Sequence, residues 1–267
     1  MLKKRLIACL LWNNGMIVQS INFRHTNSVG NAITAVEFFH TWAIDEIIIL
    51  DVSRDNSQRE KFFEIIQELS SRLFIPLTIG GKIQDTETMK RLFRLGADKI
   101  CINTAAVKNP SLITEAATMF GNQAVVVSID TKLNNGKYEV YINQGREPTR
   151  LNAVEWAKTA EKQGAGEIFL TSIDRDGSRK GYDLDLVKRV SESVSIPVIA
   201  SGGVGEWQHL VDGILLGKAD AVSAANIFHY FEQSTKKAKD YMLTRGIDVR
   251  KPVFYTIKTP RNPRYAV

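Results

Sequence analysis

Continuous apolar runs alternate with longer amphipathic segments along most of the chain. The runs are rich in β-branched residues and carry few polar positions, which is typical of strands covered on both faces. Eight of them occur, at residues 5–12, 46–51, 75–79, 98–102, 123–130, 166–171, 197–201 and 219–225. Between them, apolar residues recur at steps of three and four, which predicts helices, most clearly over 57–72 and 85–95.

Eight strand–helix units in about 250 residues are the pattern of a (β/α)8 TIM barrel, an α/β fold. A doubly wound open sheet shows the same alternation and stays an alternative. An internal half-barrel repeat favours closure, because IIILDVSRD (47–55) matches IFLTSIDRD (168–176), and Asp98 and Asp220 hold equivalent positions. We expect a single barrel over residues 1–250 and a basic, proline-containing C-terminal tail over 251–267.

Composition and charge exclude several classes of protein. The chain is 44% hydrophobic and 24% charged, and no apolar run approaches the ~20 residues of a membrane span. Cys9 and Cys101 are too few for a disulfide framework, which fits a reducing cytoplasm, and the histidines lack metal-ligand spacing, so we expect neither metal nor cofactor. Of the net charge of +6, four positive charges fall in the tail, which leaves no clustered basic face for nucleic acid.

Paired glycines follow two of the predicted strands and precede predicted helices. Gly80-Gly81 and Gly202-Gly203 occupy repeat-equivalent positions, and the next strand in each half ends in Asn103-Thr104 or Ala225-Asn226. Glycine lets the backbone approach an anion, and exposed N–H groups bind phosphate. The pattern predicts two phosphate sites on opposite sides of the barrel end where the strands finish, although each pair can also be read as a tight turn.

One carboxylate stands out at the same end of the barrel. Asp130 ends the buried run VVVSID, which is where active-site residues of such barrels lie. We interpret it as a candidate general acid or base, against the alternative of a solvated turn residue. Asp174 and Asp176 can also reach this end, within a stretch, SIDRDGS, that equally signals a turn.

Charged residues gather at the opposite ends of the strands. Four of them lie at or near the starts of the first, second, fourth and sixth predicted strands, namely Arg5, Glu46, Lys99 and Glu167. Each alone reads as a solvated strand end. Together, two positive and two negative side chains can close the barrel floor with salt bridges, because charges inside a barrel must be paired.

The stretches IPLTIGG, VVVSID, GAGEIFLTSIDRDG and SIPVIASGG resemble the cyclase subunit (HisF family) of imidazole glycerol phosphate synthase, and the resemblance covers about residues 3–250. It implies a (β/α)8 barrel in a heterodimer with a glutaminase subunit, which docks on the bottom face and releases ammonia. Ammonia then crosses the barrel and reacts with a phosphorylated ribonucleotide.

The resemblance also implies roles for individual residues. Arg5, Glu46, Lys99 and Glu167 match the ammonia gate of the family, Asp98 matches a residue of the partner interface, and Asp130 matches one of two acid/base aspartates. The positions that match phosphate-binding residues are Gly81, Asn103, Thr104, Asp176, Gly177, Gly202, Gly203, Ala225 and Asn226.

The departures from the family fall on the face that would carry the chemistry. Leu11 stands where the family has its other acid/base aspartate, and leucine transfers no proton. Lys82 replaces a third glycine, Asn226 replaces a serine, and Val18-Gln19-Ser20 replaces a loop with a mobile lysine. The bottom face is kept while the top face differs, which indicates specialisation rather than decay.

Our leading hypothesis is therefore an ammonia-channelling amidotransferase subunit whose acceptor is no longer the usual ribonucleotide. Similar chains are associated with amidation of bacterial surface sugars such as those of lipopolysaccharide, alongside a third protein, a sugar amidotransferase. One alternative is an ordinary cyclase of histidine biosynthesis, and another is a noncatalytic activator of the glutaminase. A related sugar-phosphate isomerase needs no ammonia, so the four charged residues of the floor argue against it.

Overall fold

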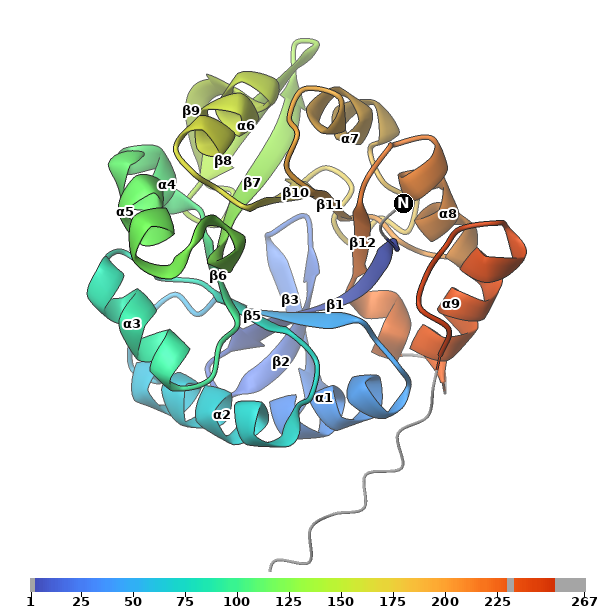
Figure 1. Cartoon of the computed structure of the whole chain (residues 1–267), viewed down its shortest axis with the longest axis horizontal. Coiled ribbons are helices and arrows are strands. Elements are labelled where there is room, and N and C mark those ends of the chain that lie inside the picture. The colour runs from blue at the N-terminus through green and yellow to red at the C-terminus, as the bar shows by residue number, and fades with distance from the viewer. Residues whose placement is uncertain (1–2, 230–232, 253–267) are drawn as a thin grey trace, which may run out of the picture.

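The computed structural model describes residues 3–229 and 233–252, and within them the eight predicted strands form a closed parallel barrel (Figure 1). Each barrel strand pairs with its neighbours, and the pairings of β1 with β12 and of β7 with β10 complete the ring. The open-sheet alternative is therefore wrong. The barrel strands are β1 (Arg5–Asn13), β4 (Glu46–Asp51), β5 (Leu77–Gly80), β6 (Lys99–Ile102), β7 (Val125–Asn134), β10 (Glu167–Ser172), β11 (Val198–Ser201) and β12 (Ala221–Ala224).

Helices surround the barrel and bury one apolar stripe each (Figure 1). The helices expected over 57–72 and 85–95 are α2 (Arg59–Arg72), which buries Phe62, Ile66 and Leu69, and α3 (Thr86–Arg94), which is capped by the Asp85 side chain. The others are α1 (Ala32–Thr41), α4 (Thr104–Lys108), α5 (Ser111–Phe120), α6 (Ala153–Lys162), α7 (Leu184–Ser191), α8 (Trp207–Leu215) and α9 (Ser234–Thr244). No helix within the described ranges is both long and apolar enough to cross a membrane.

The barrel interior holds a second, smaller apolar core that is separate from the core between barrel and helices. Because strand residues alternate in direction, every second side chain points inward. The inward residues that form this core are Ile7, Cys9, Ile48, Cys101, Val126, Phe169, Ile199 and Ala221. The two cysteines are free thiols, and burial raises the pKa of Cys9 to about 12 and that of Cys101 in the same direction.

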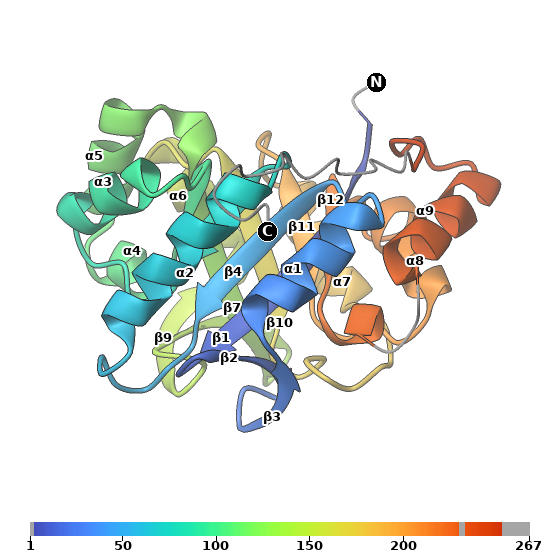
Figure 2. The ribbon, with the colours of Figure 1, turned by 90° about the horizontal axis from the view of Figure 1, so that it is seen from below.

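Two hairpins extend the barrel at the end where its strands finish. The apolar pattern does not predict them. The strands β2 (Met16–Ile21) and β3 (His25–Gly30) fold back on β1, and β8 (Lys137–Ile142) and β9 (Glu147–Asn152) fold back on β7. Figure 2 shows β2 and β3 projecting from this end, opposite the start of β1. We call this end the mouth of the barrel and the opposite end its floor.

The two halves of the barrel repeat one backbone contact at the floor. The Asp98 carboxylate accepts a hydrogen bond from the Leu77 N–H at 2.8 Å, and the Asp220 carboxylate accepts one from the Val198 N–H at 3.2 Å. Asp98 is exposed, and its role at a partner interface stays a prediction. Most of the expected tail, residues 253–267, lies outside the described residues.

Candidate functional site

The four charged residues at the floor form one closed ring of ion pairs, as the sequence pattern predicts. Arg5 donates to Glu46 at 2.8 Å and to Glu167 at 2.7 Å. The Lys99 amine lies 3.0 Å from Glu46 and 2.8 Å from Glu167. Charges alternate around the ring, so it is neutral as a whole. We call Arg5, Glu46, Lys99 and Glu167 the floor ring.

The floor ring is largely removed from solvent. Only 2% of the Glu46 side chain is exposed, and Thr78 donates a further hydrogen bond to it at 2.9 Å. Burial lowers the pKa of Arg5, but attraction to Glu167 and Glu46 and their hydrogen bonds outweigh this effect and raise it. All four side chains therefore have opposite charges as neighbours, which is the condition for keeping ions away from water.

At the mouth, Asp130 occupies the position expected of an acid or base. It lies at an inward position of β7 and is 9% exposed. Its register partner on the neighbouring strand β10 is Thr171. Burial, aided by the charge of Asp176, raises its pKa to about 7 against the hydrogen bonds from Ser128 and Asn103. A carboxyl group that titrates near neutrality can both give and take a proton, which is the property a general acid or base needs.

Asn103 lies beside Asp130 and contacts it directly. Its Nδ2 donates to Asp130 Oδ2 at 2.8 Å, while Ser128 Oγ lies 3.4 Å from Asp130 Oδ1. Thr104 begins α4, and its hydroxyl oxygen accepts the backbone N–H of Asn143 from the β8–β9 turn at 3.0 Å. The sequence places these residues at one strand end, and the structure adds that they share contacts with the carboxylate and the hairpin.

Leu11 is partly buried and packs onto the interior apolar core together with Leu50. It pairs with Val18 of β2 as well, so apolar side chains lie on both neighbouring strands. A carboxylate at this position would be desolvated next to apolar groups and would need a partner. The leucine thus extends the interior core toward the mouth and carries no group able to transfer a proton.

The glycines of the two predicted phosphate sites have conformations that only glycine adopts easily. Gly81, Gly202 and Gly203 have φ values of +91°, +92° and +103°. A Cβ on Gly81 would lie 2.2 Å from the Asp51 carbonyl oxygen, and one on Gly203 would lie 2.2 Å from that of Gly181. Close backbone packing therefore accounts for these glycines, and the two phosphate sites stay a prediction.

The remaining predicted positions lie on the same end of the barrel. Asp176 accepts hydrogen bonds from Ser20 Oγ at 2.6 Å and from the Phe23 N–H at 3.2 Å, which fastens the β2–β3 hairpin to the loop after β10. Burial raises the pKa of Asp176 against these bonds. Gly177 packs under the Ser20 carbonyl, and Ala225-Asn226 lead from β12 into a short 3₁₀ helix.

Sequence reasoning missed a charged cluster beside the first glycine pair. Asp51 ends β4 with a fully buried side chain, 2.8 Å from Arg59 and 3.8 Å from the Lys82 amine. Lys82 also reaches the Asp55 carbonyl, and its own backbone has a φ of +55°. The sequence did contain one signal for this cluster. Lys82 replaces a glycine, keeps the left-handed backbone and adds a charge.

The two hairpins meet above the mouth. Gly145, in the β8–β9 turn, lies so close to Phe23 that a Cβ on it would be 3.0 Å from that ring. From the same turn, Gln144 Nε2 donates to the Val52 carbonyl at 3.1 Å. The β8–β9 turn thus joins the loop after β4, Thr104 and the first hairpin, and it covers part of the mouth.

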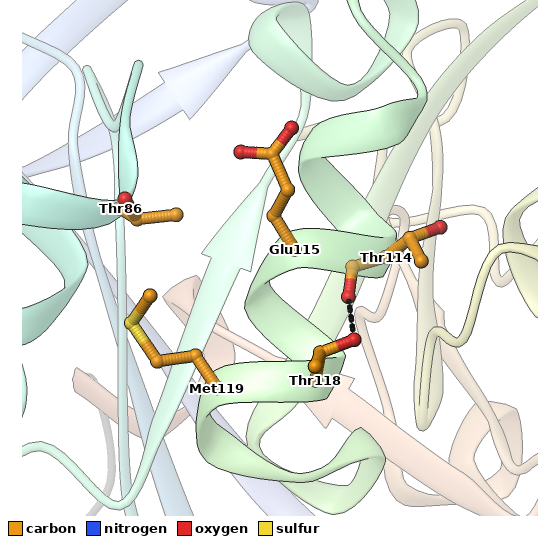
Figure 3. Close-up of a pocket in the computed structure, with 5 residues that line it drawn as sticks. All are labelled: Thr86, Thr114, Glu115, Thr118 and Met119. Carbon is orange, nitrogen blue, oxygen red and sulfur yellow. Dashed lines mark hydrogen bonds between the residues drawn. The ribbon is translucent and has the colours of Figure 1, made fainter.

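A separate cavity of about 410 Å³ lies on the outer layer between α3 and α5 (Figure 3). Its lining consists of Thr86, Thr114, Glu115, Thr118 and Met119. The cavity contains none of the residues of the floor or the mouth, and the Thr118 hydroxyl donates to the Thr114 carbonyl within α5. We therefore treat it as a feature of helix packing.

Comparison with known proteins agrees with this geometry. Residues 5–234 match the family described as histidine biosynthesis protein. The chain is 46% identical over 250 residues to imidazole glycerol phosphate synthase subunit HisF of Chlorobium limicola, an alignment that covers 94% of this chain and all of that protein.

Proposed function

The chain belongs to the histidine biosynthesis protein family, as an enzyme subunit of the HisF cyclase type, and we propose that it works in a glutamine amidotransferase complex. A glutaminase subunit binds at the floor and supplies ammonia, which crosses the barrel to the mouth. There the ammonia serves the amidation of a bacterial surface sugar, with a sugar amidotransferase as a third component. The observation that carries this proposal is the combination of a complete floor ring with Leu11 at the mouth.

The floor ring supports the first half of the proposal. A closed, neutral ring admits nothing while all four ion pairs are made, so passage requires one side chain to swing out. Lys99 is the best candidate, because its charge sits on a single amine at the end of a flexible stem, whereas Arg5 bridges the two glutamates with two nitrogens of a planar guanidinium group. Asp98 sits exposed next to Lys99 and is suited to a partner that controls this movement.

The interior core above the ring supports transport of a small neutral molecule. It is lined by aliphatic, aromatic and thiol side chains, and the pKa of both thiols is raised by burial, so the lining carries no charge. An ammonium ion would lose its hydration there at high cost, whereas ammonia crosses without a charge to desolvate. The lining therefore favours the form of nitrogen that can act as a nucleophile.

At the mouth, Asp130 is the group available to move a proton, and Leu11 removes the second. A reaction that depends on two carboxylates should lose a factor of about 10²–10⁴ in rate when one is absent. This is why we propose a different acceptor. The pKa of Asp130, about 7, is a specific observation in favour of the second candidate, an ordinary cyclase in which this one group suffices.

Cyclisation of the usual ribonucleotide with ammonium salt at high pH separates the two candidates. The chain is compared with Leu11→Asp and Asp130→Asn, without any glutaminase. We expect no turnover in the wild-type chain and a gain of activity in Leu11→Asp. Turnover near that of an ordinary cyclase, lost in Asp130→Asn, would identify a histidine enzyme and overturn the proposed specialisation.

A second measurement tests the route of ammonia. With a glutaminase that forms a stable heterodimer with the chain, glutamine hydrolysis and ammonia release to solvent are followed together. We expect Lys99→Ala to hydrolyse glutamine while ammonia escapes, whereas Lys158→Ala, which changes an exposed ion pair, leaves the coupling intact. Unchanged coupling in Lys99→Ala would count against a passage controlled by the floor ring.

A further inference from the structure

Asn103 does not make the side-chain hydrogen bond to the helix that its position in the chain favours. It is the N-cap residue of α4, where an asparagine oxygen ordinarily accepts a hydrogen bond from the first turn of the helix. Here the side chain makes no such bond and instead donates to Asp130 at 2.8 Å. A broken local preference beside a buried carboxylate is typical of a functional position.

The other end of the same amide is unsatisfied. Asn103 Oδ1 is buried and accepts no hydrogen bond from the described residues. Leaving such an acceptor unpaired is unfavourable, and turning the amide over would set Oδ1 against the Asp130 carboxylate. The ionised acid therefore fixes the orientation of the amide and leaves Oδ1 as an unpaired acceptor beside Asp130.

Asn103 lies on the same strand line as Lys99 of the floor ring. Lys99, Cys101 and Asn103 are alternate residues on one strand line, so all three face the barrel interior. Lys99 belongs to the floor ring and Cys101 to the interior core. Asn103 thus lies where a molecule that enters beside Lys99 and follows this strand reaches the mouth.

We infer that Asn103 is a positioning residue that holds ammonia beside Asp130 through its unsatisfied side-chain oxygen. The inference rests on the proposed function and names the atom that receives the nitrogen. A phosphate group has only acceptor oxygens at neutral pH and cannot satisfy Oδ1, so any phosphate contact here falls to the neighbouring N–H groups and Thr104. Leu11 offers no polar atom, which leaves Asn103 and Asp130 as the pair that orients the nucleophile.

The chemistry of this arrangement balances without a further reagent. Ammonia donates one N–H to Asn103 Oδ1 and a second to the Asp130 carboxylate, and its lone pair points to the acceptor. As the nitrogen forms a bond to an electrophilic carbonyl or imine carbon, the π electrons of that carbon move to its heteroatom. The extra proton on nitrogen passes to Asp130, which takes it as general base.

The test uses the full-length, ¹⁵N-labelled chain at pH 8 with unlabelled ammonium chloride as the probe and potassium chloride as the control salt. The backbone amide of Thr104 reports binding in every variant by NMR. We expect a saturable shift with ammonium only, an apparent affinity at least tenfold weaker in Asn103→Leu, and partial retention in Asn103→Gln, which keeps an uncharged amide oxygen. Asn56→Ala, at an exposed loop asparagine, should behave as the wild type.

Three results would overturn the inference. These are equal shifts with potassium, no saturation with ammonium, and an unchanged ammonium response in Asn103→Leu or, should that variant not fold, in Asn103→Ala. The outcome is distinguishable from the fate of the proposed function, because loss of glutaminase coupling with intact ammonium binding removes only the latter. Intact coupling with no ammonium response removes only the role of Asn103.

Discussion

The floor and the mouth of this barrel treat buried charge in opposite ways. In the floor ring, every charged side chain has two partners of opposite sign within 3.0 Å. At the mouth, Asp130 has no cation among the partners that shift its pKa, and its neighbour Asn103 keeps an unpaired oxygen. The floor is satisfied internally, whereas the mouth keeps a buried acceptor without a partner among the described residues.

This difference separates a structural arrangement from a reactive one. Buried polar groups are paired in most folded proteins, so a fully paired ring needs no further explanation, whereas an unpaired buried acceptor beside a carboxyl group does. Burial without a neighbouring counter-charge also raises the pKa of Asp130 to about 7, close to neutral pH. Three substitutions test this comparison.

The largest effect is expected from Glu46→Ala in the floor ring. The change removes the partner of both Arg5 and Lys99 and leaves two cations to share Glu167. Breaking a buried ion pair on one side costs roughly 3–5 kcal/mol in the free energy of unfolding. Urea denaturation followed by tryptophan fluorescence measures it.

Glu155→Ala is the matched control for this change. It also deletes one glutamate from an ion pair, at 3.0 Å from Lys158, but 69% of that side chain is exposed. Exposed pairs contribute about 0–1 kcal/mol, so the control should change little. Equal losses in the two variants would show that the floor ring contributes no more than a surface pair.

An effect of opposite sign, which is smaller than that of Glu46→Ala except at high pH, is expected at the mouth from Asp130→Asn. The pKa of Asp130 is about 7 in the folded chain, whereas an aspartate in an unfolded chain titrates near ~3.9. Between these values the folded chain binds a proton that the unfolded chain does not, so the carboxyl destabilises the fold progressively as the pH rises from about 4 to about 7. The amide variant escapes this penalty.

We therefore expect Asp130→Asn to match the wild type near pH 4 and to exceed its stability by up to roughly 4 kcal/mol at pH 8. Urea midpoints of both proteins across this range provide the measurement. Because the charge of Asp176 contributes to the raised pKa of Asp130, the difference between the two proteins reports Asp130 together with this interaction. A difference that does not vary with pH would mean that Asp130 is solvated and ordinary, which would remove the contrast with the floor.

The smallest effect should come from the hairpin that covers the mouth. Gln144→Ala deletes the hydrogen bond to the Val52 carbonyl at the tip of the β8–β9 turn. One such bond contributes about 1 kcal/mol, so local opening should become about fivefold more frequent with little global destabilisation. Hydrogen exchange of the Asn143 amide, which donates to Thr104, reports this opening.

Gln123→Ala, at an exposed glutamine, serves as the reference for the hairpin variant. Its Asn143 exchange should equal that of the wild type. Identical exchange in Gln144→Ala would show that the turn is held by the Asn143 and Phe23 contacts alone.

The sequence was sufficient for the barrel because its strands are buried on both faces. Glu46–Asp51 was predicted without error, and the other strands differ from prediction only near their ends, where backbone pairing rather than hydrophobicity decides the last residue. The hairpins were missed because β3, with the sequence HTNSVG, has no apolar face. The tight turns that lead into them, between β1 and β2 and between β7 and β8, carry a sequence signal, since Asn14-Gly15 and Asn135-Gly136 have the positive φ values that such turns require.

The candidate site was only partly predictable for a different reason. Strand ends identified Asp130 and Asn103 as neighbours, but the direction of the Asn103 amide depends on a contact across two strands. The order of the ion pairs in the floor ring likewise depends on the register between β1, β4, β6 and β10. A pattern along the chain contains no such register, so the partners of each charge emerge only in three dimensions.

The charges of the floor ring are divided unequally between the two halves of the barrel, and this limits how such halves can combine. Both cations, Arg5 and Lys99, come from the first half together with Glu46, whereas the second half contributes only Glu167. A barrel assembled from two copies of the first half would bury an excess of positive charge at its floor, and one from two second halves would bury glutamates alone. The repeated halves have therefore become complementary rather than interchangeable, and their charges select the mixed pair over either self-pair.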